Sequence, residues 1–290
     1  MAMTQSGLVA DALTARTGRA VELVGVTTEG DVSKALLAQI GGTGVFVNGL
    51  RERLLDGEID FAVHSLKDLP TGPADGITLA AVPPRDDPRD ALCGPAKLAD
   101  LRRGARIGTG SPRRVAQLRA LRPDLDVVPI RGNADTRLRK VTDGEVDAVV
   151  LAYAGLNRIG RLDAVSEIFE PDQMLPAPGQ GALAIECRAD RDDLIELLAI
   201  LDDAPTRAAV TAERALLATL EAGCSAPVGA YAAWEDQIVH LTGAVVGYDG
   251  ERQIRLSESG SPDESERLGR DLALRMLAEG ADQLMGESTS

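Results

Sequence analysis

Three stretches of the 290-residue sequence predict an α/β protein with a smaller α+β domain at its carboxyl end. Residues 105–152 show the order strand, helix, strand, helix, strand, which is the pattern of an open parallel sheet. Residues 8–82 also alternate helical and extended signals. From residue 205 onward, a long helical segment is followed by three strand-like segments and a final helix. We therefore expect two α/β domains and a third domain of the α+β class.

The first domain is expected to hold helices near 8–17 and 46–56 and strands near 21–26, 59–64 and 77–82. The strand at 59–64 is strongly apolar, and the loop that follows it contains Lys67 and Asp68. Ligands of open α/β sheets bind beyond the carboxyl ends of the strands, so this loop lies on the expected ligand side. A Lys–Asp pair is also common in solvated turns, and only its position after the strand favours a ligand-binding role here.

The second domain has the clearest local signals. A strand at 105–109 precedes Ser111, which fits a helix N-cap, and Pro112, which fits the first helical position. That helix is expected to run to 121, and the next elements are a strand at 126–130, a helix ending at 142 and a strand at 147–152. Every strand in this series is therefore followed by a helix or loop at the same edge of the sheet.

Basic side chains collect at this edge. Five arginines follow strand ends or lie in the first helical turns, namely Arg113, Arg114, Arg131, Arg137 and Arg158. The helix start at Ser111 adds backbone N–H donors and a favourable dipole for an anion. The planar guanidinium fork matches a carboxylate, so these groups and Lys67 predict a ligand with several carboxylates. Pairing with nearby aspartates explains Arg119, Arg122 and Arg139 better than it explains these five.

The third domain is introduced by a rigid turn at 175–181 and a strand at 182–187 that returns the chain to the first domain. Helices are expected at 191–201 and 205–222, strands at 228–233, 238–247 and 252–258, and a terminal helix at 263–285. The predicted division is 1–83 with 182–200 for domain 1, 84–181 for domain 2, and 204–290 for domain 3.

Composition and charge exclude several classes of protein. The net charge of −14 and the 2% content of aromatic residues disfavour nucleic-acid binding. Residues 102–161 nevertheless hold twelve Arg and one Lys against six Asp and Glu, a local charge of about +7 that indicates a site for an anionic small molecule. Three scattered cysteines and two distant histidines predict no metal site. Without an apolar run of membrane-spanning length or a signal peptide, the protein is expected to be cytoplasmic.

The three cysteines differ in their surroundings. Cys187 lies in an apolar alternating strand and Cys93 follows Asp-Ala-Leu, so both are expected to be structural. Cys224 stands in a glycine-flanked turn, EAGCSAPVG at 221–229, after the long helix. A thiol in such an accessible loop is either a nucleophile or an attachment point, or it is a loop residue without a function, and the residues leave these alternatives balanced.

Several motifs together resemble one family. They are HSLKDLP at 64–70, DPRDA at 87–91, GTGSPRR at 108–114, RGN at 131–133 with TR at 136–137, AGLNR at 154–158, LPAPGQGA at 175–182 and GC at 223–224. Each motif is weak alone, but they span most of the chain in the expected order. The sequence resembles the porphobilinogen deaminases, also called hydroxymethylbilane synthases.

This resemblance implies a fold and a reaction. The fold would be two α/β lobes like those of periplasmic binding proteins, with the active site between them, and a third domain carrying the cysteine. The reaction would join four porphobilinogen molecules head to tail with loss of ammonia, and then release hydroxymethylbilane by hydrolysis. A dipyrromethane cofactor, covalently attached to Cys224, would hold the growing chain. Each added unit brings an acetate and a propionate, which accounts for arginines in an acidic protein.

The resemblance also assigns roles to residues. Asp68 would be catalytic, because a carboxylate suits pyrrole N–H groups and the cationic azafulvene-type intermediate left by ammonia. The cofactor carboxylates would be held by Lys67, Ser111, Arg113 and Arg114. The substrate and the growing chain would be bound by Arg131, Arg137, Arg158 and Gln5. Residues 29–44, with the glycines of GGTG at 41–44, would form a mobile loop over the cleft.

The sequence departs from the family pattern at two places. Family members begin with a strand reading roughly I-x-G-T-R-x-S-x-L-A, and here Ala2 falls where that motif ends. A missing strand would leave its neighbours unpaired and remove a cleft arginine. At Asn48 and Gly49, the family more often has a polar residue and glutamate, which affects a helix start or a surface pair.

These observations leave a leading hypothesis and two alternatives. The leading one is a transferase of tetrapyrrole and haem biosynthesis that acts as a monomer, needs no metal, nucleic acid or membrane, and passes its product to uroporphyrinogen III synthase. A truncated, inactive member of the family is the first alternative. A two-lobed binding protein for an anionic small molecule is the second, and it leaves Cys224 and the Lys67–Asp68 pair unexplained.

Overall fold

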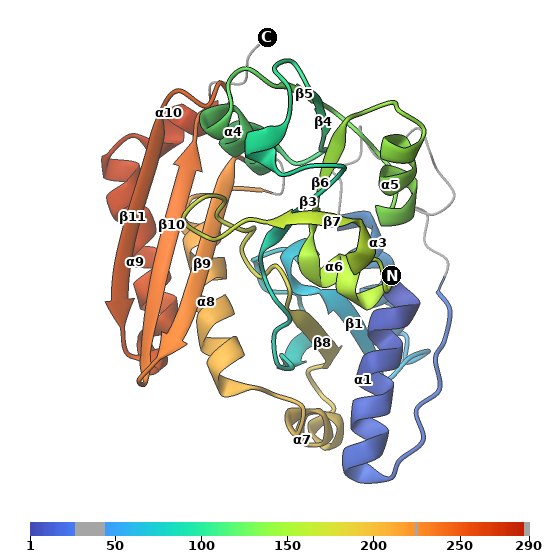
Figure 1. The fold of residues 1–290 in the computed structure, drawn as a ribbon. Coiled ribbons are helices and arrows are strands. Elements are labelled where there is room, and N and C mark those ends of the chain that lie inside the picture. Colours follow the sequence, from blue (N-terminus) through green and yellow to red (C-terminus); the bar gives the residue numbers. More distant parts are fainter. Residues whose placement is uncertain (27–43, 224–225, 287–290) are drawn as a thin grey trace. The chain divides into compact units, whose positions relative to one another are not determined.

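The computed structural model describes residues 1–26, 44–223 and 226–286 (Figure 1). The chain separates into two compact units. Unit 1 consists of Met1–Arg85 and Ala182–Arg207, and unit 2 consists of Asp86–Gly181 and Ala208–Ser290. Unit 2 therefore combines most of the predicted second and third domains, and the division into three domains stays a prediction.

Unit 1 is built on a three-stranded antiparallel sheet with the order β1-β8-β2. Its elements are α1 (Ala2–Thr17), α3 (Gly44–Leu55), β1 (Phe61–Ser65), the 3₁₀ turn η1 (Leu66–Asp68), β2 (Ile77–Ala81), β8 (Leu183–Arg188) and α7 (Asp192–Ala199). Helix α1 ends at Gly18, whose φ of 70° lets the backbone N–H return to the carbonyl of Thr14. Val9 and Leu13 of α1 pack with Ile185 of β8 and Leu198 of α7.

The opposite face of this sheet is polar although it is buried. Arg51 of α3 donates from Nε and Nη2 to the Glu186 carboxylate of β8, at 3.0 and 2.6 Å. His64 of β1 brings Nε2 to 3.3 Å from the same carboxylate. All three side chains are largely or fully buried. Helix α3 is therefore held on the sheet by a charge network as well as by apolar contacts.

The predicted strand at 21–26 is wrong. The segment has no regular secondary structure and no strand ladder, and Leu23 and Val24 are 41% and 55% exposed. The alternation of apolar residues was suitable for a strand, but an extended segment becomes a strand only when neighbouring backbone groups complete its hydrogen bonds. No such neighbour lies beside residues 21–26 in the part of unit 1 that the structure describes.

Unit 2 contains a five-stranded mixed sheet with the order β5-β4-β6-β3-β7. Strand β4 runs parallel to β5 and β6, whereas β3 is antiparallel to β6 and β7. The elements are β3 (Asp90–Cys93), η2 (Leu98–Asp100), β4 (Arg106–Gly108), α4 (Pro112–Leu121), β5 (Asp126–Val128), α5 (Ala134–Thr142), β6 (Ala148–Ala152), α6 (Tyr153–Arg158), η3 (Leu162–Ala164) and β7 (Val165–Ile168). The predicted β-α-β-α-β series is confirmed, and β3 and β7 are added to it.

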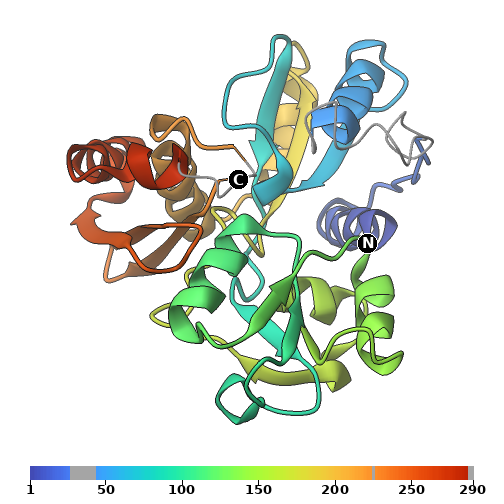
Figure 2. The ribbon, with the colours of Figure 1, turned by 90° about the horizontal axis from the view of Figure 1, so that it is seen from above.

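The carboxyl-terminal part of unit 2 has an antiparallel sheet of order β11-β10-β9 covered by helices (Figure 2). Its elements are α8 (Ala204–Thr219), which begins in unit 1, β9 (Val228–Glu235), β10 (Ile238–Val246), β11 (Gln253–Gly260), η4 (Pro262–Glu264), α9 (Ser265–Ala278) and α10 (Ala281–Gly286). The predicted single helix at 263–285 is two helices, because Gly280 adopts a φ of +94° that breaks the chain after α9. At Gly269 a methyl group would collide with the backbone of α8, so α8 and α9 approach closely there.

No helix in the described ranges combines the length and the apolar character that crossing a bilayer requires. Within the same ranges, no group of three or more His, Cys, Asp or Glu side chains is arranged to hold a metal ion.

Candidate active site

The predicted residues Lys67 and Asp68 lie in the short turn η1, directly after β1. The turn is fixed at both ends, because Leu66 N–H donates to the carbonyl of Ala182 at 3.0 Å and Leu69 N–H donates to that of Leu66 at 3.1 Å. Both side chains of the pair are half-buried. The loop is therefore held by the strand ladder, and its polar groups remain partly accessible.

Gln5 lies on α1 and is buried. Its Nε2 donates to the Ser65 hydroxyl at 2.8 Å. Ser65 is the last residue of β1, three positions before Asp68. Gln5 thus anchors the end of the strand that leads to the catalytic candidate, and its assignment as a substrate ligand stays a prediction.

The basic candidates of unit 2 meet at one edge of its sheet. Strands β4, β5 and β6 are parallel, so the residues that follow them emerge at the same edge. Ser111 starts α4 after β4, Arg131 follows β5, and Arg158 ends α6 after β6. Ser111 occupies the N-cap position, but its side chain makes no capping hydrogen bond within the helix. Its hydroxyl therefore does not satisfy the first N–H groups of α4.

Arg113 and Arg114 share one carboxylate, that of Asp90 at the start of β3. Arg113 Nη1 is 2.7 Å from Asp90 Oδ2, and Arg114 Nη2 is 2.7 Å from Asp90 Oδ1. Asp90 is completely buried and both arginines are nearly so. Burial alone would raise the pKa of Asp90, but the charges and hydrogen bonds of the two guanidiniums hold it well below its usual range. The cluster carries two positive charges against one negative charge.

The donors of the two arginines are used differently. Arg114 spends Nε and Nη2 on Asp90 and gives Nη1 to the carbonyl of Val150 at 2.9 Å. Arg113 gives Nη1 to Asp90 and to the carbonyl of Leu175, each at 2.7 Å. The Nε atom of Arg113 is buried and has no hydrogen-bond partner among the residues that the structure describes. An unpaired buried N–H is costly, so this atom is suited to an acceptor supplied by a bound anion.

Arg131 lies in the loop between β5 and α5, and Arg137 lies in the first turn of α5. Arg131 is exposed and Arg137 is half-buried. Arg137 Nε donates to the carbonyl of Gly132 at 2.8 Å. Gly132 has a φ of +108°, and a methyl group there would touch Thr136. Burial, and to a smaller extent the charge of Arg114, lowers the pKa of Arg137.

Arg158 binds the two ends of the first unit 2 segment, Asp86–Gly181. Its Nε donates to Asp86 Oδ2 at 2.8 Å, and its Nη2 donates to the carbonyl of Gly181 at 2.6 Å. The Arg158 side chain is 6% exposed. It therefore has a fixed position in the absence of a ligand.

Two of the three cysteines are buried, as expected for structural cysteines. Cys93 and Cys187 are both buried in strands. Burial raises the pKa of the Cys93 thiol to about 12 and also raises that of Cys187, so both are poor nucleophiles. Cys224 lies outside the described residues, as do residues 29–43 of the predicted mobile loop.

Sequence reasoning missed the acidic partners of these arginines and the glutamine that supports one of the carboxylates. Asp86, Asp90 and Gln180 were in or next to recognised motifs, but no role was assigned to them. Gln180 Nε2 donates to Asp90 Oδ1 at 2.8 Å and to the carbonyl of Pro88 at 2.7 Å. The only signal for Asp90 was an aspartate directly before the apolar run ALC, where a buried strand begins.

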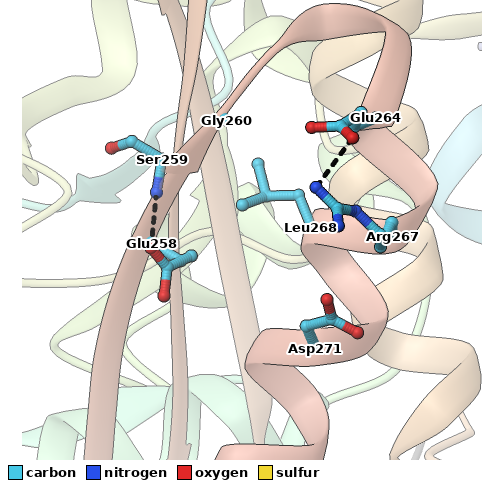
Figure 3. Close-up of a pocket in the computed structure, with 7 residues that line it drawn as sticks. All are labelled: Glu258, Ser259, Gly260, Glu264, Arg267, Leu268 and Asp271. Atoms are coloured by element: carbon cyan, nitrogen blue, oxygen red, sulfur yellow. Dashed lines mark hydrogen bonds and ion pairs between the residues drawn. The ribbon is translucent and has the colours of Figure 1, made fainter.

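A shallow pocket elsewhere in unit 2 contains none of the predicted residues (Figure 3). It has a volume of about 200 Å³ and is lined from β11 by Glu258, Ser259 and Gly260, and from η4 and α9 by Glu264, Arg267, Leu268 and Asp271. Arg267 is paired with Glu264 at 2.7 Å. Three carboxylates and one arginine line the pocket, so its lining is net negative and disfavours an anionic ligand.

The comparisons with known proteins agree with the geometry. Residues 1–196 match the family model for "Porphobilinogen deaminase, dipyromethane cofactor binding domain", and residues 207–278 match that for "Porphobilinogen deaminase, C-terminal domain". The chain belongs to the porphobilinogen deaminase family. It is 59% identical to the porphobilinogen deaminase of Thermobifida fusca over 302 residues, covering 100% of this chain and 94% of the relative.

Other relatives in the porphobilinogen deaminase family are similar over the same extent. Porphobilinogen deaminase 1 of Streptomyces coelicolor is 58% identical, with 99% of this chain and 95% of the relative covered. The Mycobacterium tuberculosis porphobilinogen deaminase is 53% identical, with 98% and 95% covered. Among solved structures, a periplasmic substrate-binding protein of an ABC transporter from Coxiella burnetii shows a TM-score of 0.43 and 15% identity over 69% of this chain and 87% of that chain.

The residues present fit the dipyrromethane cofactor that the family model names. A dipyrromethane built from porphobilinogen units is a polycarboxylate. Unit 2 offers the unpartnered Nε of Arg113, the hydroxyl of Ser111 and the start of α4 at one sheet edge. Within the described part of the chain these donors lack acceptors, which is the arrangement that a bound carboxylate completes.

Proposed function

We propose that the protein is a porphobilinogen deaminase, a transferase that joins four porphobilinogen molecules head to tail and releases hydroxymethylbilane by hydrolysis. Each condensation forms a carbon–carbon bond between pyrrole units and releases one ammonia. The main support is the gathering of positively charged groups at the carboxyl edge of the β4, β5 and β6 strands in a protein of net charge −14. A growing chain that gains two carboxylates per unit needs such a surface.

The cofactor, attached to Cys224, would supply the pyrrole carbon from which the chain grows. In our proposal, its carboxylates are bound by Arg113, Ser111 and Lys67. Arg114 acts mainly by holding Asp90, because its donors are already paired in the structure. Its predicted direct contact with a cofactor carboxylate would need one of these bonds to be exchanged.

Asp68 is proposed as the catalytic carboxylate. The turn η1 holds it half-buried at the end of β1, beside Lys67. A carboxylate in this position can accept hydrogen bonds from pyrrole N–H groups. It also stabilises the positive charge that develops on the substrate as ammonia leaves, and it can hold the proton that moves in that step.

Arg131, Arg137 and Arg158 are proposed to bind carboxylates of the substrate and the growing chain. Arg131 is exposed and Arg137 half-buried, so these two can follow a ligand that lengthens. The Nε and Nη2 atoms of Arg158 are already bonded within the protein, so this guanidinium suits a single defined carboxylate. Gln5 supports the end of β1 and completes the set that the resemblance assigns.

The experiment that tests the proposal is intact-protein mass spectrometry of the full chain beside a Cys224→Ala variant. We expect the wild-type protein to carry an added mass equal to a dipyrromethane and the variant to lack it. Colour with Ehrlich's reagent should follow the same pattern. An unmodified wild-type mass in protein that turns over porphobilinogen would contradict the covalent attachment at Cys224.

The proposal extends to the oligomeric state, the location and the enzyme that takes the product. We propose that it acts as a monomer in the cytoplasm and that its product passes to uroporphyrinogen III synthase. The transfer is supported by the chemistry, since hydroxymethylbilane is an open chain and ring closure is the next step toward a cyclic tetrapyrrole.

A further inference from the structure

One side chain, that of Arg158, binds the segments at two of the three points where the chain crosses between the units. The chain enters unit 2 at Asp86 and leaves it after Gly181. Asp86 N–H donates to the carbonyl of Gly181 at 3.3 Å, so the two crossing segments touch at this point. Arg158 binds the carboxylate of the first and the carbonyl of the second, at 2.8 and 2.6 Å.

The two crossing segments approach each other closely at Gly181. Gly181 adopts a φ of +88°, and a methyl group there would lie against the backbone carbonyl of Asp86. The neighbouring Gln180 donates to the carbonyl of Pro88 at 2.7 Å, which ties the same two segments together once more. A movement of either crossing must therefore be accompanied by a change at Arg158.

Two donor atoms of Arg158 bind groups of the protein, and a third can bind an acceptor from a ligand. Nε and Nη2 are committed to Asp86 and Gly181, and Nη1 has no hydrogen-bond partner within the described ranges of the chain. The side chain is 6% exposed, whereas that of Asp86 is 37% exposed. Two fixed nitrogens of a planar guanidinium determine the direction of the third. Nη1 is therefore a preoriented donor.

We propose that Asp86 is a positioning residue for Arg158: it fixes the guanidinium so that Nη1 receives a carboxylate of the substrate or growing chain. The inference rests on the proposed substrate-binding role of Arg158. Because the same guanidinium holds Gly181, occupation of Nη1 is also transmitted to the two crossing segments. Asp86 supplies the negative charge that makes the buried guanidinium tolerable before a ligand arrives.

The first test is the variant Asp86→Asn in the cofactor-loaded full chain. Asparagine keeps the shape and an acceptor oxygen but removes the charge that orients Arg158. We expect KM for porphobilinogen to rise about tenfold, the effect of losing one well-oriented charged hydrogen bond, with kcat changed by less than about twofold. Cofactor loading by mass and the thermal midpoint should stay at the wild-type values.

Two further variants make the result specific. Asp86→Glu keeps the charge and should restore KM to within about threefold of the wild-type value, since the longer side chain still reaches a guanidinium. Asp163→Asn is the matched control, because Asp163 pairs with Arg161 at 3.5 Å on the exposed surface of the same unit. We expect this control to leave KM unchanged.

Hydrogen exchange provides a readout that does not depend on turnover. In the wild-type protein, substrate should slow exchange at the amides of 85–87 and 180–184, and in Asp86→Asn this protection should disappear. If Asp86→Asn is poorly folded, the same comparison is made with Asp86→Glu, where protection should persist. Equal protection in the wild type and a folded Asp86→Asn would overturn the inference.

The sign of the KM change decides between Asp86 as a support and Asp86 as a competitor. A lower KM in Asp86→Asn would show that the carboxylate competes with substrate and would overturn the inference, as would an unchanged KM. Arg158→Gln separates this from the proposed function. A raised KM in Arg158→Gln with a silent Asp86→Asn overturns only the positioning role, whereas a silent Arg158→Gln removes Arg158 from the substrate site.

Discussion

At the scale of single residues, the site is a set of positive groups whose charges are only partly balanced. Asp90 neutralises one charge of the Arg113 and Arg114 pair, and Asp86 neutralises Arg158. The buried carboxylates hold the arginines in place, while the excess positive charge and the unpaired Nε of Arg113 remain for a ligand. The same chemistry therefore serves both the fold and the proposed binding of anions.

The role of Asp68 gives a direct prediction. Asp68→Asn keeps the size of the side chain but cannot balance positive charge, so turnover of porphobilinogen should fall by roughly 100-fold or more. The dipyrromethane mass should remain attached. The exposed Asp75 on the same unit provides the control Asp75→Asn, with activity expected to stay at the wild-type level. Near-normal turnover in Asp68→Asn would refute the catalytic assignment.

The Asp90 carboxylate gives a prediction for stability. Asp90→Asn leaves two buried guanidiniums without a counter-charge, so we expect unit 2 to lose about 3–5 kcal/mol of unfolding free energy. Denaturant titration followed by circular dichroism measures this. The exposed pair of Arg106 and Asp126, at 3.4 Å, supplies the control Asp126→Asn, which should change stability little. A loss for Asp90→Asn no larger than that of the control would contradict the structural role.

At the scale of elements, helix α3 depends on a buried charge network for its position. Its Arg51 binds Glu186 of β8, and His64 of β1 lies against the same carboxylate. Strand β1 continues into η1, so the packing of α3 and the support of the turn that carries the proposed catalytic Asp68 share one strand. A change in this network is therefore expected to affect unit 1 before unit 2.

The network predicts acid sensitivity. Burial alone would raise the pKa of Glu186, but hydrogen bonds and charge from His64 and Arg51 lower it to about 2 from the usual 4.5. A group with a lowered folded-state pKa stabilises the fold above its unfolded pKa and loses that contribution as the pH falls. We expect about 3 kcal/mol to be lost between about pH 4.5 and pH 2.

The measurement is the unfolding free energy as a function of pH for wild type and Glu186→Gln. The variant should be less stable at neutral pH and should lack the wild-type loss below pH 4.5 that comes from this carboxylate. Parallel curves for the two proteins across the acid range would show that the pairing does not carry the predicted linkage.

At the scale of the whole molecule, the chain forms two compact units. Unit 2 contains both the sheet edge at which the arginines follow β4, β5 and β6 and the sheet that follows α8. The predicted elements of 105–152 and the three strands after residue 227 were confirmed with shifts of one or two residues at most ends. Those segments carry strong local signals, such as Ser111 and Pro112 at the start of α4. The strand at 21–26 failed because its formation depends on a neighbour, which local alternation does not specify.

The sequence by itself determined the family, the order of most elements and the edge at which the arginines emerge. These follow from periodicity, helix starts and motif spacing, all of which act over a few residues. Only the tertiary structure decided which carboxylates meet those arginines. Asp90 is 23 positions from Arg113, Asp86 is 72 from Arg158, and Glu186 is 135 from Arg51. No local pattern links such residues. The fold brings their side chains together, and they pair because a buried charge without a partner is too costly.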